Sequence, residues 1–231
     1  MDRLIGKATS SVEGAELASA RLRRCTALCL LCVGLFFALG RMGSAIASAK
    51  SSVRYSFENA IQGWQAQDYE DSMACERVGR SEERSKEGRY SLRMVMDLVG
   101  GDSHKSKGEA WVNMRENGPK GVKVPANLDK RTITAWVYAP KGARGEPSRP
   151  NGFQLFVKDS DWRSEYGAWL NVKEGQWTRI SLPVTSSKPS KGWMDKGFDP
   201  TRIIALGVKM GAGGGSDAKY KGAVFVDAVE W

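Results

Sequence analysis

Several short segments of the sequence alternate aromatic and polar residues with apolar ones. In residues 132–138, for example, Trp136 and Tyr138 share one parity, and the residues of the other parity are apolar. Successive side chains of a β-strand point to opposite faces, so each segment has one apolar face and one face that mixes rings with polar groups. Such rings can bury the flat apolar face of a ligand, at roughly 25 cal/mol per Å². Polar neighbours can then hydrogen-bond hydroxyl groups at its edge.

The mixed face supplies a set of candidate binding residues. We expect its rings to stack on a ligand and its amide and ammonium groups to hydrogen-bond hydroxyls or a carboxylate. The set comprises Trp111, Trp136, Tyr138, Gln154, Lys158, Trp169, Asn171 and Lys209. The alternative is that loops cover these rings, which would make them a second layer of core.

The other tryptophans occupy different contexts. Trp64, Trp177 and Trp231 lie at strand ends or turns, where we expect core roles. Trp162 and Trp193 lie in polar loops and could stand at the rim of a site.

The elements that must position these residues are short strands. Runs rich in β-branched and aromatic residues are separated by polar turns, and no stretch has sustained helical periodicity. The expected strands are 53–57, 73–78, 89–96, 109–114, 132–138, 153–158, 166–172, 177–182, 203–210 and 223–231. Short strands at this spacing, with 26 glycines in the chain, predict an all-β fold, either a sandwich or a barrel.

The first 49 residues have the pattern of an export signal. Arginines at 21, 23 and 24 precede an apolar stretch, Cys25–Gly40, of 16 residues, whereas a membrane-spanning helix needs about 20. Ala47-Ser48-Ala49 supplies small residues at the spacing that signal peptidase accepts. We therefore expect a signal peptide at residues 1–49, cleavage after Ala49 and one domain at residues 50–231. The domain would be secreted or periplasmic; the alternative is an uncleaved membrane anchor.

Cysteine usage limits how the domain can be held together. Three of the four cysteines lie in the apolar N-terminal stretch, which leaves Cys75 alone in residues 50–231. One cysteine cannot form an internal disulfide, so packing or a metal ion must stabilise the domain.

Six short motifs occur in an order that resembles a known family. They are YSFE at 55–58, GW at 63–64, EGRYSL at 87–92, GQWTRISL at 175–182, DPTRIIALGV at 199–208 and GAVFVD at 222–227. The sequence is similar to the calcium-binding jelly-roll carbohydrate-binding modules of secreted mannanases and xylanases, in the galactose-binding-domain-like superfamily. This resemblance implies a two-sheet β-sandwich with jelly-roll topology. It also implies non-catalytic binding of a polysaccharide or glycan outside the cytoplasm, with a separately encoded glycanase as a candidate partner.

The resemblance further implies a structural Ca²⁺ site where the first and last strands meet. Glu58 and Asp227 match the family's early and late carboxylates, and backbone carbonyls near Glu87 and Arg89 would complete the shell. Such oxygens suit Ca²⁺, which takes six to eight of them. The alternative is that the two carboxylates form salt bridges with Arg or Lys.

Few residues could perform catalysis. The single histidine, His104, lies in a polar loop, and the chain has no G-x-S-x-G motif. A glycosidase needs only two carboxylates, and Asp159, Asp161 and Glu165 cluster around Trp162, so a jelly-roll glycanase or lyase is an open alternative. A structural or protein-interaction sandwich is another. Because catalytic candidates are so few, we expect no enzyme activity. The net charge of +9 comes without a nucleic-acid motif, so we also expect no nucleic-acid partner.

Overall fold

The computed structural model describes residues 52–69, 72–101, 104–187, 191–213 and 219–231. The predicted signal peptide and its cleavage site lie outside these residues. In the described part of the chain, no helix is long and apolar enough to cross a membrane. Its elements are β1 (Val53–Tyr55), β2 (Trp64–Ala66), β3 (Cys75–Ser81), β4 (Ser91–Leu98), β5 (Lys107–Asn113), α1 (Met114–Asn117), β6 (Thr132–Tyr138), β7 (Gly152–Asp159), β8 (Ser164–Tyr166), β9 (Leu170–Asn171), β10 (Trp177–Pro183), β11 (Trp193–Met194), β12 (Ile203–Gly211) and β13 (Tyr220–Glu230).

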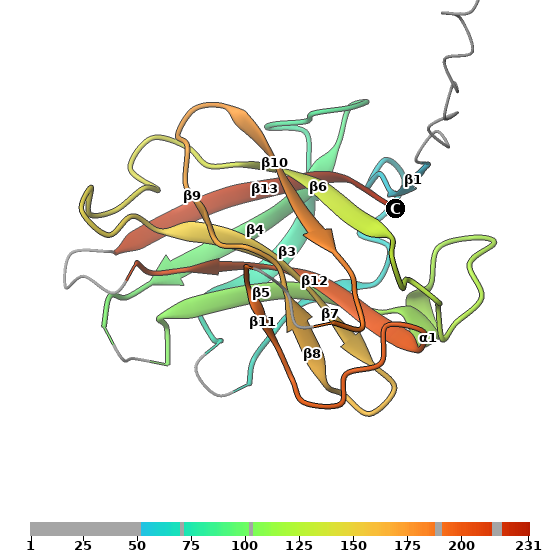
Figure 1. The fold of residues 1–231 in the computed structure, drawn as a ribbon. Helices are drawn as coiled ribbons and strands as arrows, with labels where there is room; N and C mark the ends of the chain where they lie inside the picture. Colours follow the sequence, from blue (N-terminus) through green and yellow to red (C-terminus); the bar gives the residue numbers. More distant parts are fainter. Residues whose placement is uncertain (1–51, 70–71, 102–103, 188–190, 214–218) are drawn as a thin grey trace, which may run out of the picture. The chain divides into compact units, whose positions relative to one another are not determined.

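The strands form two antiparallel sheets that pack face to face (Figure 1). We call sheet A the one with the order β10-β6-β13-β4-β3, in which β1 also pairs with β13. Sheet B has the order β11-β8-β7-β12-β5-β2, with β9 also paired to β7. The chain passes from one sheet to the other at each step from β1 to β3 and from β4 to β7, and again before β10, β11 and β13. These crossings produce the expected two-sheet jelly-roll sandwich.

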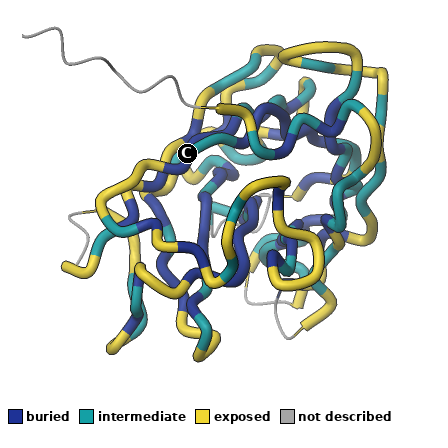
Figure 2. Tube along the Cα trace, turned by 90° about the vertical axis from the view of Figure 1, so that its right-hand side faces the viewer, coloured by how far each residue is buried: buried dark blue, intermediate teal, exposed yellow. Residues whose placement is uncertain are grey.

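The core lies between the sheets, and strand alternation explains its composition. In β6, Ile133, Ala135 and Val137 are buried, as the parity of the segment predicts. The same holds for β7, where Phe153, Leu155 and Val157 point inward. Figure 2 shows the result: buried backbone runs through the centre of the domain, and exposed residues gather in the loops.

An aromatic cluster closes the sandwich where its first and last strands meet. Trp64 is fully buried, and its ring centroid lies 5.7 Å from those of both Tyr55 and Phe57, in edge-on contacts. Val53 pairs with Glu230, which places the two ends of the described domain side by side. The core role expected for Trp64 is confirmed, and Trp231 is partly buried against the same core.

The segment 166–172, expected as one strand, is divided. β8 ends at Tyr166, β9 begins at Leu170, and residues 167–169 between them belong to neither strand. Because the strand is interrupted, one parity does not run through the whole segment. Leu170 pairs with inward-facing Phe153, but Tyr166 pairs with outward-facing Phe156. Alternation through one unbroken strand, with Trp169 and Asn171 facing outward, would place Tyr166 in the core, and for Tyr166 that prediction was wrong.

Candidate functional site

The outer face of sheet B consists of rows of side chains set by strand pairing. Residues paired across antiparallel strands point to the same face of the sheet. The first row, which is largely aromatic, is Trp111, Gly207, Phe156, Tyr166 and Trp193. The second row is Glu109, Lys209 and Gln154, and the third is Lys107, Gly211, Gly152 and Asn171. An aromatic row thus lies beside polar and glycine-containing rows.

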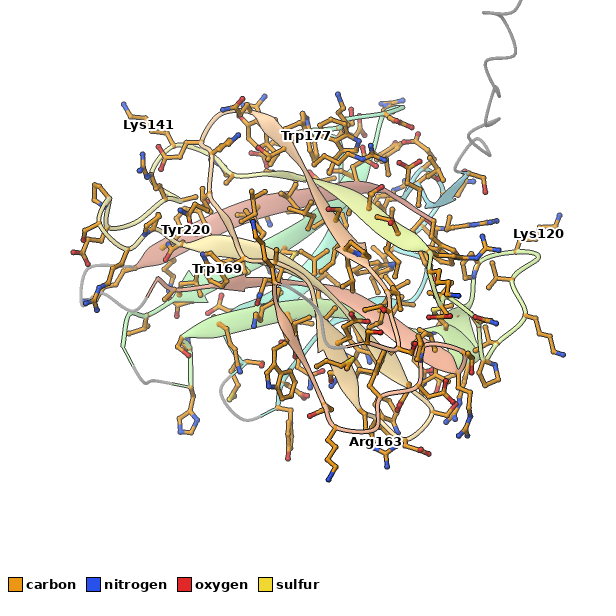
Figure 3. All side chains as sticks on the ribbon, viewed as in Figure 1. Lys120, Lys141, Arg163, Trp169, Trp177 and Tyr220 are labelled. Carbon is orange, nitrogen blue, oxygen red and sulfur yellow. The ribbon has the colours of Figure 1, made fainter. Side chains whose placement is uncertain are left out.

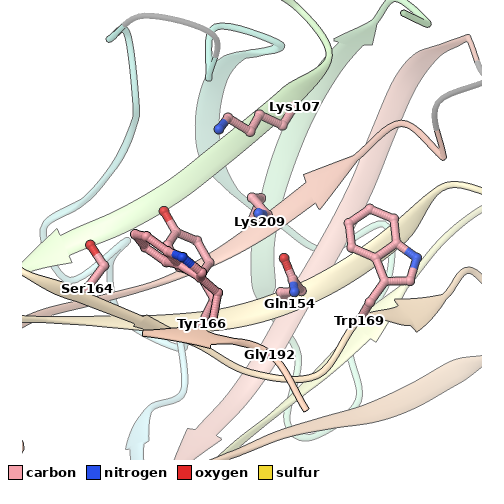
Figure 4. A pocket seen from close by; sticks show the side chains of 8 residues that line it. Lys107, Gln154, Ser164, Tyr166, Trp169, Gly192 and Lys209 are labelled. Carbon is pink, nitrogen blue, oxygen red and sulfur yellow. The ribbon is translucent and has the colours of Figure 1, made fainter. Parts of the chain in front are cut away.

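A pocket of about 580 Å³ opens over these rows, and we call it the sheet B groove (Figure 4). Its lining is Lys107, Gln154, Ser164, Tyr166, Trp169, Gly192, Trp193 and Lys209. Figure 4 shows Tyr166 at one end and Trp169 at the other, with Gln154 and Lys209 between them. The volume lies in the range of small-molecule sites, and two aromatic walls with a polar floor are typical of such sites.

Trp169 forms one wall because two glycines leave room for its ring. A Cβ atom on Gly152 would lie 2.2 Å from the indole, and one on Gly211 would lie 3.0 Å from it. The ring therefore packs directly against the backbone of sheet B. Its Nε1 donates a hydrogen bond to Asn171 Oδ1 at 3.0 Å, and 40% of the residue stays exposed. Backbone and amide contacts thus hold an indole that remains open to solvent.

Tyr166 forms the opposite wall and contacts several neighbouring side chains. Its hydroxyl donates to Glu109 Oε1 at 3.1 Å, and Lys209 Nζ lies 4.3 Å from the centre of its ring. The ring also lies 5.3 Å from Phe156 and 5.8 Å from Trp193, centre to centre. Trp193 is 55% exposed and extends this wall toward solvent.

Glu109 is a buried carboxyl group beneath a cationic surface. It is only 3% exposed, and this burial raises its pKa. The positive charges of Lys209, Lys158 and Lys107, together with the hydrogen bond from Tyr166, act against that rise in pKa. Three ammonium groups therefore lie near enough to this carboxyl group to favour its ionised form.

Several of the residues predicted for the site do meet at the groove. Gln154, Trp169 and Lys209 line it, and Asn171 positions the indole. Gln154 Nε2 donates to the carbonyl of Gly167 at 2.9 Å, which ties the groove floor to the segment after β8.

Two further predicted residues lie on the same face but beside the groove. Trp111 meets Trp162 edge-on, with ring centres 5.9 Å apart. Lys158 Nζ lies 5.9 Å from the ring of Phe156. Neither side chain is among the groove's lining residues.

The prediction that Trp136 and Tyr138 share a surface with Trp111 and Trp169 was wrong. Both belong to β6 and face outward from sheet A, on the opposite side of the sandwich. There the β3–β4 loop covers them: Lys86 Nζ lies 4.1 Å from the Trp136 ring and Arg84 lies 5.3 Å from the Tyr138 ring. Alternation within a strand tells which side chains face the core and which face outward. It does not tell which sheet the strand joins, and the outer faces of sheets A and B lie on opposite sides of the sandwich. Trp177, expected in the core, packs beside Tyr138 and is only partly buried.

The sequence prediction missed three lining residues that carry side chains: Lys107, Ser164 and Tyr166. Lys107 has the parity of Trp111, so its outward direction could be inferred from the alternation. Trp193, expected at the rim of a site, does line the groove, but nothing in its loop indicates that it pairs with Tyr166. The interruption after β8 hid Tyr166 and Ser164, because their parity differs from that of the residues that follow.

The acidic cluster considered for hydrolysis performs other roles. Asp159 is buried and accepts hydrogen bonds from the backbone N–H groups of Asp161, Arg163 and Asp199. Asp161 forms ion pairs with Arg163 and Arg202. Glu165 points into the sandwich, where burial raises its pKa to about 7. These three carboxyl groups do not line the sheet B groove.

The residues expected to bind Ca²⁺ meet at the β3–β4 loop. Asp227 accepts hydrogen bonds from the N–H groups of Lys86 and Glu87, at 2.7 and 3.0 Å, and Glu58 accepts from those of Arg89 and Tyr90. Neither carboxylate forms an ion pair with a described Arg or Lys. Burial raises the pKa of Asp227, and the negative charge of Glu58 adds to that rise. Within the described ranges, no group of three or more His, Cys, Asp or Glu side chains is placed to hold a metal.

Comparison with known proteins finds no matching family model and no matching curated protein. Solved structures of carbohydrate-binding modules are similar. One, a module of the β-sandwich superfamily described as promiscuous in specificity, is 17% identical with a TM-score of 0.46, covering 80% of this chain and 63% of that one. The CBM22-1 xylan-binding domain of Paenibacillus barcinonensis Xyn10C is 15% identical with a TM-score of 0.43, covering 76% and 89%.

A further xylan-binding domain of CBM 22 is 14% identical with a TM-score of 0.43, covering 79% of this chain and 94% of that one. These neighbours are of the kind that the sequence motifs resemble. All three TM-scores lie below 0.5.

Proposed function

We propose that this protein binds a polysaccharide or glycan, without cleaving it, in the sheet B groove. The observation that carries the proposal is the pair of exposed aromatic walls, Trp169 and the Tyr166–Trp193 pair, on either side of a polar floor. A pyranose ring presents an apolar C–H face that can stack on an indole or phenol. Its hydroxyls need hydrogen-bonding partners when they leave water, and Gln154 and Lys209 lie where they can supply them.

The described lining of the groove contains no pair of carboxyl groups that could perform hydrolysis. Glycosidases use two carboxyl groups on either side of the scissile bond. Among the described residues, none that lines the groove is an Asp or Glu, and the nearby carboxyl of Glu109 is buried beneath Tyr166 and Lys209. This arrangement supports a holding role.

The proposal is tested by affinity electrophoresis in gels that contain soluble mannans, xylans, glucans or pectins. At least one polysaccharide should retard the protein, and Trp169→Ala and Trp193→Ala should each restore its mobility. Trp136→Ala is the matched control, because it removes an indole from sheet A and should leave retardation unchanged. If none of the polysaccharides retards the protein, a structural or protein-interaction sandwich is favoured. Release of reducing ends or unsaturated products would instead indicate an enzyme.

We also propose that Ca²⁺ binds near Glu58 and Asp227. Support comes from two carboxylates of like charge that approach one loop without an Arg or Lys ion pair among the described residues. A divalent cation would offset their mutual repulsion and would link β13 to the β3–β4 loop. Added Ca²⁺ should raise the Tm and EDTA should reverse the rise, whereas Asp227→Asn should remove the response; an unchanged Tm in the wild type would contradict the proposal.

We propose, finally, that the domain acts outside the cytoplasm after removal of residues 1–49. The support is the order of arginines, apolar stretch and small residues in the N-terminal sequence. N-terminal sequencing of the exported protein should begin at Lys50, and a mature chain that begins upstream would contradict cleavage after Ala49. A separately encoded glycanase as partner stays a prediction.

A further inference from the structure

We propose that Trp111 and Trp162 form a second aromatic subsite, which binds a further sugar unit of the glycan chain that occupies the sheet B groove. We call this pair the Trp162 platform. The inference rests on the proposed glycan-binding function and adds to it the length and the path of the ligand. The observations are an exposed indole with an unusual backbone conformation, a turn that holds it in place, and its position at one end of the groove.

The indole of Trp162 is displayed at the surface. Trp162 is 49% exposed, and it is one of the three most exposed tryptophans among the described residues. The other two, Trp169 and Trp193, line the groove. The ring of Trp162 meets that of Trp111, which points outward from sheet B in the same row as Tyr166. Burial of this indole would have stabilised the fold, so packing alone does not explain its position.

The backbone of Trp162 has a conformation that bulky residues rarely adopt. Its φ is 63°, in the left-handed region, where a Cβ atom lies too close to the following carbonyl oxygen. Gly, Asn or Asp would occupy such a turn position with less strain. A half-exposed aromatic residue in a strained conformation is typical of a functional position.

The turn between β7 and β8 holds Trp162 in this conformation. The carboxylate of buried Asp159 accepts hydrogen bonds at 2.9 Å from the N–H groups of Asp161 and Arg163, the residues on either side of Trp162. The N–H of Trp162 donates to the carbonyl of Asp159, also at 2.9 Å. Arg163 Nη1 donates to the carbonyl of Gly197 at 2.8 Å, which ties the turn to the loop before β12. Because the turn is held in this way, little ordering is needed when a sugar stacks on the indole.

The Trp162 platform lies beyond one end of the sheet B groove. Figure 4 shows Ser164 at the end of the groove opposite Trp169. Ser164 is two residues from Trp162, and Arg163 between them lies well away from Trp169 (Figure 3). A chain that stacks on Trp169 and passes Tyr166 would therefore leave the groove beside Ser164 and reach the platform.

The spacing of the strands sets the length of this ligand. Trp111 lies in β5 and Tyr166 in β8, with β12 and β7 between them. Three strand spacings of 4.7–4.9 Å separate the two residues by about 14 Å along the row. One pyranose unit is too small to contact both rings, so the platform adds affinity only for a chain of several units. The ligand is therefore an oligosaccharide or a longer chain rather than a single sugar.

The test measures affinity as a function of chain length by isothermal titration calorimetry on the full-length protein. The probes are β-1,4-linked oligosaccharides of xylose, mannose and glucose and α-1,4-linked oligogalacturonides, each from disaccharide to octasaccharide. In at least one series, affinity should rise beyond the length that fills the groove. Trp162→Gly should remove this rise and weaken octasaccharide binding at least tenfold, because a sugar can no longer cover the half-exposed indole. Its affinity for disaccharides should match the wild type.

Further variants distinguish stacking from a structural role. Glycine accepts a φ of 63° without strain, so Trp162→Gly should stay folded. Trp162→Phe keeps an aromatic ring and should retain most of the gain with length, whereas Trp169→Ala should weaken short and long chains alike. Trp136→Ala is the matched control, because it removes an indole from sheet A and should leave the whole length series unchanged.

The outcomes separate this inference from the proposed function. If Trp162→Gly binds octasaccharides as tightly as the wild type, or weakens disaccharides and octasaccharides equally, the Trp162 platform is refuted while loss of binding in Trp169→Ala still supports the groove. Light scattering checks a different occupant. A dimer that Trp162→Gly dissociates, with glycan affinity unchanged, would show that a second copy of this chain covers the ring. Absence of wild-type binding in all four series would contradict both proposals.

Discussion

Replacement of Gly152 by alanine tests whether the backbone of sheet B positions the indole of Trp169. Gly152 lies in β7 on the outer face, and three atoms of the indole lie 2.2–2.6 Å from the position that a Cβ atom would take. No stable structure tolerates such a contact, so the added methyl group must displace the ring. Because Trp169 is partly exposed, the ring can swing toward solvent, and we expect the sandwich to stay folded without its aromatic wall.

The magnitude follows from the exposed area of Trp169. A tryptophan side chain offers up to about 250 Å², and 40% exposure leaves about 100 Å² for a sugar to cover. At roughly 25 cal/mol per Å², stacking contributes about 2.5 kcal/mol, which corresponds to a roughly 60-fold change in Kd. Gly152→Ala should lose about as much affinity as Trp169→Ala, and the double variant should lose little more, because both changes remove the same contact.

Affinity for the best glycan would be measured by calorimetry, and stability by urea unfolding. Gly79→Ala is the matched control: Gly79 is also a strand glycine, in β3 of sheet A, and a Cβ atom there would meet no atom within 4 Å. It should leave affinity unchanged. A folded Gly152→Ala variant that binds as tightly as the wild type would refute the proposed positioning of Trp169.

Three further outcomes are expected. Burial raises the pKa of Glu165 to about 7 from an ordinary 4.5, so the native state holds this proton more tightly than the unfolded state and stability should fall as pH rises from about 4.5 to above 7. The free energy of unfolding should fall by roughly 3 kcal/mol over this pH range. In urea unfolding at pH 5 and pH 8.5, Glu165→Gln should show a smaller difference between the two free energies than the wild type. An equal difference in both proteins would contradict the assignment. Cys75 is 3% exposed, and burial raises its pKa to about 12. It should therefore resist a thiol reagent at pH 8 until urea unfolds the protein. Rapid labelling of Cys75 in the native protein would contradict its burial. Lys86→Met should cost about 0.5–1 kcal/mol in urea unfolding by removing the cation above Trp136 and should leave glycan affinity unchanged, whereas reduced affinity would implicate sheet A in binding.

Local alternation predicted much of the fold. The segment 132–138 coincides with β6, and its three apolar residues of one parity are the ones that face the core. The same reasoning held for β7, because a half-buried strand has to place its apolar side chains on one face. It failed at Tyr166, where the chain leaves the sheet after only three residues of β8 and the parity of the following residues no longer applies.

The composition of the site depends on pairings that alternation does not encode. Trp169 needs Gly152 from β7 and Gly211 from β12, residues far from it in the sequence that become neighbours only when those strands pair. The separation of Trp136 from Trp111 likewise depends on which sheet each strand joins, and both assignments satisfy the same pattern of apolar residues. Strand order and register are therefore the information that was missing.

The pairing of Val53 with Glu230 has a practical consequence. It places both ends of the described domain in sheet A, whereas the groove opens on the outer face of sheet B. An affinity tag or biotin attached after Trp231 would leave the domain from the sheet that does not carry the groove. The protein could then be tethered to a sensor chip by its carboxyl end with Trp169 directed toward the flowing analyte.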